Sequence, residues 1–363
     1  LIELADAALA MPNLETCVRL VQRANARNAL IDAGKVLQVR AATSDATIEE
    51  MIGDAKTALD DATNALPDAP PFAEQVAEFA EDLERQRRGE EGATLAAKTG
   101  FIDLDEMLNV GGLPRRSLVV CAGRPSMGKS TVAMNAVLHA ARNGARCLVW
   151  PMEEGLRGWL DRACRHLTGV KTKSPRDMSD ADFETLQRTL VVDVPALKLE
   201  VLDNDRPASL AEIRRQARRF ASRHDGIDVL VVDHLTLLKL PKAERRDLAV
   251  AEMTRGLKLL AAELDCCVLL VCQLNRQVEA REGHEPRLSD LRDSGAIEQD
   301  ADVALFVHRP SYYIADKRAL SEEQLRLAKL IVAKQRNGET GVVPLLFFGE
   351  TFTFKTAVFG MGK

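Results

Sequence analysis

The sequence lacks any apolar run long enough to cross a membrane, and it is poor in aromatic residues. Its longest apolar run, Cys266 to Cys272, has only the length of a strand, whereas a membrane-spanning helix needs roughly 18 residues or more. Only two tryptophans and two tyrosines occur among 363 residues. We therefore expect no membrane partner, and any nucleic acid would be bound mainly without base stacking on aromatic side chains.

Paired cysteine motifs are also missing. The seven cysteines form no C-x-x-C pair that is matched by a second pair or by histidines at zinc spacing. Cys121, Cys147, Cys267 and Cys272 fall instead within apolar segments. We expect them to be small buried hydrophobic residues in a protein from a reducing compartment.

An excess of positive charge is absent, because the formal net charge is -5. The hydrophobic share of 46% and the charged share of 28% are those of an ordinary globular protein. A surface that is basic all over is therefore excluded, and nucleic acid would have to bind at a localised basic site. No signal-peptide pattern opens the chain. Since it starts at Leu1, we expect it to be a piece of a longer protein.

The first hundred residues predict helices only. Residues 1–66 are rich in alanine, leucine and charge, and predict a helical hairpin whose second helix starts at a capping box of Thr47 and Glu50. A proline-rich break then opens a linker, 67–98, with an amphipathic helix over Phe72 to Arg88. Its apolar stripe packs either on its own domain or on a neighbouring subunit, and the sequence does not separate these alternatives.

From residue 99 to 363 the pattern alternates between strands and helices, which predicts an α/β domain. The expected strands are Leu118–Ala122, Cys147–Pro151, Leu197–Leu202, Val229–Asp233, Val268–Gln273, Val303–Val307, Leu330–Ala333 and Val342–Phe348. Helices fill most intervals up to Gln273, whereas Asn337 and Gly338 signal a hairpin between the last two strands. The sheet should be mainly parallel with an antiparallel edge.

One segment carries a specific chemical signal. Residues 123–130 match the phosphate-loop pattern G-x-x-x-x-G-K-S/T, between an expected strand and an expected helix. The predicted nucleotide-binding residues are Gly123, Arg124, Pro125, Ser126, Met127, Gly128, Lys129, Ser130 and Thr131. Backbone N–H groups and the helix dipole would hold the phosphates, Lys129 would reach the β- and γ-phosphates, and Ser130 would bind Mg²⁺. The chain is predicted to bind a nucleoside triphosphate.

Polar residues at the ends of three other expected strands fit the same chemistry. Asp233 ends an apolar strand about 100 residues after the loop, where a carboxylate can hold Mg²⁺. Gln273 ends the next strand and could hydrogen-bond a γ-phosphate. A base that orients the attacking water could be either Glu153 or Glu154, and position alone leaves this choice open.

Several segments together resemble a known family. They read GRPSMGKST, VVDHLTLL, CQLNRQVE, LSDLRDSGAIEQDAD and VAKQRNGETG in chain order, and they resemble DnaB-type replicative helicases over roughly Thr99 to Phe354. The resemblance implies a RecA-like P-loop NTPase core that uses ATP and Mg²⁺. It also implies a homohexameric ring around single-stranded DNA, in the cytoplasm of a bacterial or phage-infected cell.

The resemblance also implies roles for individual residues. Glu153 takes the place of the catalytic glutamate, and Gln273 that of the γ-phosphate sensor. Lys334 and Arg336 match a basic pair that reaches the neighbouring subunit's nucleotide, with Arg336 as the arginine finger. The DNA-contacting loop corresponds to Arg292, Asp293, Ser294 and Gly295, with Asp293 where the family usually has glutamate. From the residues alone, Arg336 could equally be a solvated hairpin residue, and Arg292 is just as ambiguous.

The expected function is an ATP-driven DNA helicase, with 5′ to 3′ polarity implied by the resemblance alone. The N-terminal helices would meet a primase or a helicase loader. One alternative is a RecA-like recombination ATPase, which would form filaments on DNA. Another is a nucleotide-switched assembly scaffold, although a scaffold has no need of Glu153, Gln273 and Arg336 together.

Overall fold

The computed structural model describes residues 72–88, 96–171, 174–203, 207–241, 244–291 and 295–357, with a few isolated positions between 31 and 57. The chain divides into two compact units, Leu1–Ala93 and Thr94–Lys363. In the first unit, the predicted amphipathic helix is confirmed as α4, Phe72–Arg87. Its apolar stripe is exposed. Apart from isolated positions such as Thr47, the predicted hairpin in 1–66 lies outside the described residues, and so does Glu50 of its capping box.

The second unit is built on a nine-stranded sheet with the order β11-β10-β9-β8-β3-β7-β6-β4-β5. Its strands are β3 (Ser117–Gly123), β4 (Cys147–Pro151), β5 (Leu199–Val201), β6 (Val229–Asp233), β7 (Cys267–Gln273), β8 (Val303–His308), β9 (Leu327–Gln335), β10 (Gly341–Phe348) and β11 (Thr353–Thr356). From β8 to β5 all neighbours are parallel. The pairs that involve β9, β10 and β11 are antiparallel. The predicted mixed sheet is confirmed.

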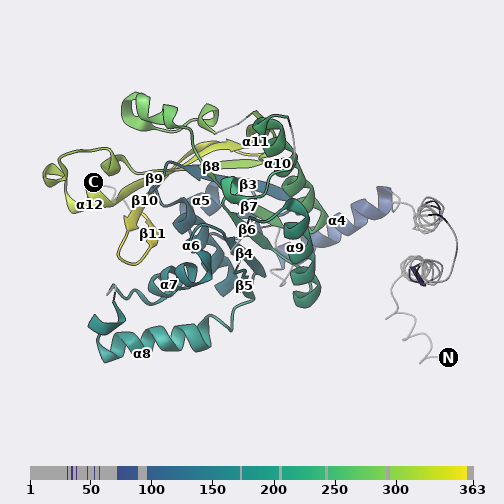
Figure 1. The fold of residues 1–363 in the computed structure, drawn as a ribbon, viewed down its shortest axis with the longest axis horizontal. Helices are drawn as coiled ribbons and strands as arrows, with labels where there is room; N and C mark the ends of the chain where they lie inside the picture. The colour runs from purple at the N-terminus through teal and green to yellow at the C-terminus, as the bar shows by residue number, and fades with distance from the viewer. Residues whose placement is uncertain are drawn as a thin grey trace. The chain divides into compact units, whose positions relative to one another are not determined.

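Helices cover both faces of this sheet (Figure 1). Helices α6 (Lys129–Arg142) and α7 (Gly155–Thr168) pack on one face, and α9 (Leu210–His224) and α10 (Arg246–Glu263) on the other. Successive side chains of β3 point to opposite faces of the sheet. Val119 therefore packs in the hydrophobic core under α6 and α7, and Val120 packs in the core under α9 and α10. The remaining α-helices are α5 (Ile102–Met107), α8 (Asp180–Arg188), α11 (Gly295–Asp300) and α12 (Glu322–Arg326).

Some elements differ from the sequence prediction. Strand β9 is nine residues long, longer than expected, because its ends alternate with polar residues and lack a continuous apolar run. Strand β11 was not predicted, and neither were the two-residue strands β1 (Ala96–Ala97) and β2 (Leu113–Pro114), which pair with each other. Such short strands carry too little apolar pattern to be recognised.

The predicted burial of the strand cysteines is confirmed. Cys121, Cys147, Cys267 and Cys272 are fully or almost fully buried and carry free thiols. Burial raises the pKa of the Cys121 thiol to about 12, so that this sulfur remains protonated and packs as a small apolar group. Among the helices in the described ranges, none is long and apolar enough to span a membrane.

Candidate nucleotide site

The phosphate loop connects the end of β3 to the start of α6, at the carboxyl edge of the parallel strands. Gly128 precedes α6 with φ 95°, a left-handed conformation that favours glycine. A Cβ on Gly128 would lie 2.8 Å from the Phe354 ring, and one on Gly123 would lie 2.9 Å from the Val307 carbonyl oxygen. Both glycines are therefore required by close packing. Between them the Met127 amide donates to the Arg124 carbonyl at 3.3 Å, which closes a turn of the kind whose other N–H groups can meet an anion.

The side chains of this loop point in different directions. Met127 is buried in the core under α6, and Arg124 is 8% exposed. The Arg124 guanidinium donates hydrogen bonds to the Glu279 carboxylate and to the Leu274 carbonyl. Its side chain is therefore held by protein groups, so its predicted contribution to phosphate binding would come from its backbone. Lys129 is also 8% exposed.

Asp233 and Ser130 meet beside the start of α6 and fit a divalent cation. Burial raises the pKa of Asp233, against the hydrogen bond from Ser130 and the lowering effect of the nearby His234 and Lys129 side chains. Its buried Oδ1 has no hydrogen-bond partner among the described residues. A buried, unsatisfied carboxylate oxygen is costly unless a cation or donor meets it. Within the described ranges no group of three or more His, Cys, Asp or Glu residues could hold a metal. A hydroxyl and a carboxylate are ligands of the kind that Mg²⁺ takes, because this ion is usually held by few protein groups together with phosphates and water.

The structure separates the two adjacent glutamates that follow β4. The Glu153 side chain is 60% exposed and its Oε2 lies 3.5 Å from Nε2 of His234. The Glu154 side chain is 11% exposed and pairs with Arg162 at 2.7 Å. Strand β4 pairs Pro151 with Asp233, so Glu153 follows directly on the edge that carries the expected Mg²⁺ ligand. This geometry supports Glu153, the choice implied by the family resemblance, as the base.

The pKa of Glu154 predicts a pH-dependent stability. Burial, together with the charges of Asp233 and Glu153, raises this pKa to about 7 in spite of Arg162. The pKa of Glu154 is higher in the folded protein than in the unfolded chain, so protonated Glu154 favours the folded state. This contribution to the free energy of unfolding is fully present below the unfolded-state pKa and is lost as pH rises through about 7. We expect Glu154→Gln to be more stable than the parent by on the order of 1–3 kcal/mol near pH 8, and equal to it near pH 4. Urea unfolding at several pH values, without magnesium, measures this; a difference that does not vary with pH would contradict it.

Gln273 lies beside the phosphate loop. It is the last residue of β7 and stands opposite Gly123 in the register of β3 and β7. Its side chain is half-buried. The register therefore brings Gln273, Gly123 and the start of the loop to one edge, as the sequence predicted for a residue that detects the γ-phosphate. Its role as that sensor stays a prediction.

Lys334 and Arg336 lie at the opposite edge of the sheet. The Arg336 amide donates to the Asp302 carbonyl, and the Asp302 amide donates to the Leu118 carbonyl, so Arg336 is level with the start of β3. Gly123 is five residues further along β3, which is about 17 Å at roughly 3.3 Å per residue. The Arg336 side chain is 51% exposed and its Nη2 donates to the Gln299 carbonyl at 2.9 Å.

Lys334 makes a similar contact. Its ammonium donates to the Glu298 carbonyl, and burial and the neighbouring Arg336 charge lower its pKa. Neither basic group contacts the phosphate loop of its own chain in the described contacts. The structure does not bring these two predicted nucleotide-binding residues together with the others within one subunit.

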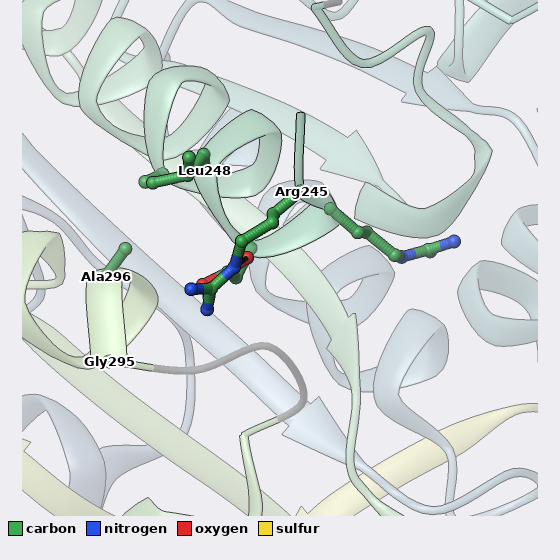
Figure 2. A pocket seen from close by; sticks show the side chains of 7 residues that line it. Arg245, Leu248, Gly295 and Ala296 are labelled. Carbon is green, nitrogen blue, oxygen red and sulfur yellow. Dashed lines mark hydrogen bonds and ion pairs between the residues drawn. The ribbon is translucent and has the colours of Figure 1, made fainter. Parts of the chain in front are cut away.

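The predicted DNA loop is described only at its end. Arg292, Asp293 and Ser294 lie outside the described residues, and Gly295 starts α11. A pocket of about 560 Å³ adjoins Gly295 and is lined by Arg245, Arg246, Asp247, Leu248, Ala251, Gly295 and Ala296. Figure 2 shows Arg245 and Leu248, at the start of α10, facing Gly295 and Ala296. The sequence analysis did not predict Arg245 and Arg246 as site residues. In the sequence they appear only as two adjacent arginines at the start of a helix, a pattern that does not indicate a binding site.

The strand order and the phosphate loop between β3 and α6 define a P-loop nucleotide-binding fold with a RecA-like core. A family model described as the DnaB-like helicase C terminal domain matches residues 96–356. The chain belongs to this DnaB-like helicase family.

Individual relatives agree with this assignment. The replicative DNA helicase DnaB of Pasteurella multocida is 35% identical over 280 residues, which cover 75% of this chain and 58% of the relative. The protein of the same name from Leifsonia xyli is 33% identical over 331 residues, which cover 88% of this chain and 69% of the relative. The chain thus spans between about half and two thirds of the length of such relatives.

Solved structures show the same fold. One is the structure of a DnaB-like replicative helicase and its interactions with primase. It has a TM-score of 0.71 and 28% identity, over 94% of this chain and 77% of that one. A solved ATPase domain also has a TM-score of 0.71, with 30% identity over 80% of this chain and its own full length. The predicted RecA-like fold and the family resemblance are confirmed.

Proposed function

We propose that this chain is the motor of an ATP-driven replicative DNA helicase, and that it works as a homohexameric ring on single-stranded DNA. The observation that carries the proposal is the position of Lys334 and Arg336. Both lie at the sheet edge opposite their own phosphate loop, so they can complete a nucleotide site only in a neighbouring subunit. Shared sites of this kind require assembly, and a closed ring gives every subunit one complete site.

Each site would divide the chemistry between two subunits. The loop backbone and Lys129 of one subunit would hold the triphosphate. Ser130 and Asp233 would hold Mg²⁺, which would supply positive charge against the phosphates. Glu153 orients the attacking water and accepts its proton, and Gln273 contacts the γ-phosphate. Arg336 of the next subunit, supported by Lys334, stabilises the negative charge of the transition state.

Unwinding of a forked DNA duplex with ATP and magnesium tests the proposal. We expect strand separation that needs both ATP and magnesium, together with closed rings in particle images. Open helical filaments on single-stranded DNA would indicate a recombination ATPase instead. Normal DNA binding and ATPase activity without strand separation would indicate an assembly scaffold.

The remaining assignments follow from the family. One solved relative is a DnaB-like helicase seen with its interactions with primase, and we propose that residues 1–66 and the linker 67–98 offer this chain's contact for a primase or a helicase loader. We place its activity in the cytoplasm of a bacterial or phage-infected cell. The loop of Arg292, Asp293, Ser294 and Gly295 would contact the DNA backbone, and 5′ to 3′ polarity is proposed from the family alone.

The pocket beside Gly295 predicts a further contact to the DNA backbone. Arg245 is exposed and its guanidinium pairs with Asp247 at 2.6 Å. If Arg245 also meets one phosphate, Arg245→Ala should lower the affinity for oligothymidylate and reduce the slope of log K against log salt by about 0.7. Arg188→Ala on α8 serves as the control, because Arg188 is an exposed arginine away from this pocket. Fluorescence anisotropy at several salt concentrations measures both, and equal slopes for the two variants would contradict the prediction.

A further inference from the structure

The Arg124 side chain connects the phosphate loop to the segment that follows β7. Its Nε and Nη2 both donate to Oε1 of Glu279, at 3.0 and 2.8 Å, and its Nη1 donates to the Leu274 carbonyl at 2.9 Å. The backbone adds a fourth link, because the Leu274 amide donates to the Gly123 carbonyl at 3.2 Å. Charge-assisted bonds from a planar guanidinium fix both distance and direction.

From Glu279 the contacts continue to the residues just before the predicted DNA loop. Glu279 belongs to the short 3₁₀-helix Arg276–Ala280. The next residue after this helix, Arg281, binds both carboxylate oxygens of Asp290, at 2.9 and 3.0 Å. Asp290 is 2% exposed.

The two ends of this segment are also joined through the backbone. The Asn275 amide donates to the Asp290 carbonyl at 2.8 Å, and Leu274 forms an isolated bridge with Leu291. The chain from Leu274 to Leu291 is thus closed on itself. One end is tied to the phosphate loop, and the other is followed directly by residue 292.

We propose that Arg124 is a positioning residue rather than a phosphate ligand. Through Glu279 it holds the closed segment Leu274–Leu291 in register with the phosphate loop, and so couples the state of the nucleotide to the DNA-contacting residues that start at Arg292. This inference rests on the proposed function, because it needs DNA to bind at that loop. Arg124, the second residue of the phosphate-loop motif, would thus link the nucleotide site to the DNA-contacting loop.

The physical basis is the arrangement of charge around a buried arginine. The Arg124 side chain is 9% exposed, whereas that of Glu279 is 47% exposed. A displacement of the loop relative to the segment would leave the buried guanidinium without its carboxylate, which is costly. The two elements therefore move together while the pair is intact. Without Glu279, the segment keeps its own internal contacts, Arg281 to Asp290 and Leu274 to Leu291, but its charged link to the loop is reduced to the Arg124 bond to the Leu274 carbonyl.

Glu279→Gln tests the proposal, with Glu282→Gln as the matched control. Glu282 is an exposed glutamate three residues further along the same segment, so both variants make the same chemical change. We expect Glu279→Gln to keep the ATPase rate measured without DNA, while the factor by which oligothymidylate stimulates that rate falls about 2- to 30-fold. Glu282→Gln should retain both quantities. Equal stimulation in the two variants would overturn the proposal.

A double-mutant cycle then separates positioning from phosphate binding. If Arg124 acts mainly through Glu279, adding Arg124→Gln to Glu279→Gln should reduce DNA stimulation by less than Arg124→Gln does in the parent, because only the Arg124 bond to the Leu274 carbonyl is left to lose. If Arg124 binds phosphate, Arg124→Gln should raise the KM for ATP in both backgrounds, which would also overturn the proposal. Arg281→Lys keeps the charge but loses the two-pronged contact to Asp290. It should lower DNA stimulation even if Glu279→Gln fails to fold, and an unchanged stimulation there would count against the chain of contacts.

The proposed function can fail separately. If the parent protein shows no stimulation of its ATPase by DNA, the helicase proposal fails, whatever the variants do. If the parent is stimulated and Glu279→Gln is stimulated equally, only the role of Arg124 fails.

Discussion

Replacing Arg336 by alanine is expected to lower the ATPase rate of assembled rings by about 10³-fold or more, the range found for arginine fingers. The guanidinium has no part in holding the nucleotide of its own chain, because it lies at the far edge of the sheet and its described contacts are to Gln299 and Asp302. Nucleotide binding should therefore change far less than turnover. Steady-state ATPase assays and the binding of a fluorescent ATP analogue measure the two effects separately.

Mixed rings show whether the finger acts between subunits. Lys129→Ala removes the lysine that we propose to bind the phosphates, and Arg336→Ala removes the proposed finger, so rings of either variant alone should be inactive. In mixed rings some interfaces pair an intact loop with an intact finger, and these should recover part of the ATPase activity. If well-assembled mixed rings stay inactive, Arg336 does not act on the neighbouring subunit.

Replacing Glu153 by glutamine is expected to lower kcat by about 10²- to 10⁴-fold with little change in KM, because a general base acts mainly in the transition state. Glu154→Gln is the matched control, since it makes the same change one residue further along. The Glu154 carboxylate is turned inward to Arg162, and its loss should cost no more than a few-fold in rate. Rapid mixing with ATP and magnesium measures the chemical step directly.

The opposite result would reassign the base. If Glu154→Gln abolishes turnover while Glu153→Gln retains it, then Glu154, whose pKa is about 7, is the group that accepts the proton. Losses of equal size in both variants would indicate that the two carboxylates act as one unit.

The sequence predicted the central sheet well because its strands are continuous apolar runs. Strand β4, Cys147–Pro151, and strand β6, Val229–Asp233, have the predicted bounds, and their buried faces are apolar on both sides of the sheet. Strand β11 could not be predicted in the same way. Its residues Thr353–Thr356 alternate too briefly to be distinguished from a loop, and they become a strand only because β10 lies beside them.

The sequence predicted which candidate residues share one edge of the sheet, but it did not predict the directions in which their side chains point. The sequence placed Gly123, Asp233 and Gln273 at strand ends, and parallel strands bring such ends to one edge. It could not say which of two adjacent glutamates turns inward, because that depends on Arg162, a residue on the following helix. Nor could it show that the Arg124 side chain turns to Glu279, which lies 155 residues further along the chain.

Strand β9 connects the edge of the sheet that carries the phosphate loop to Arg336 at the opposite edge. Near its start, Lys329 pairs with His308 at the end of β8, level with the phosphate loop, and its far end leads to Arg336. A single extended strand, held on both sides by β8 and β10, therefore runs from a subunit's own nucleotide edge to the residue offered to its neighbour. In the proposed ring this strand would connect consecutive nucleotide sites through its pairing with β8 and β10, which has a register shift between Ala304 and Leu305. A displacement of Arg336 at one subunit junction would then reach the subunit's own phosphate loop along β9.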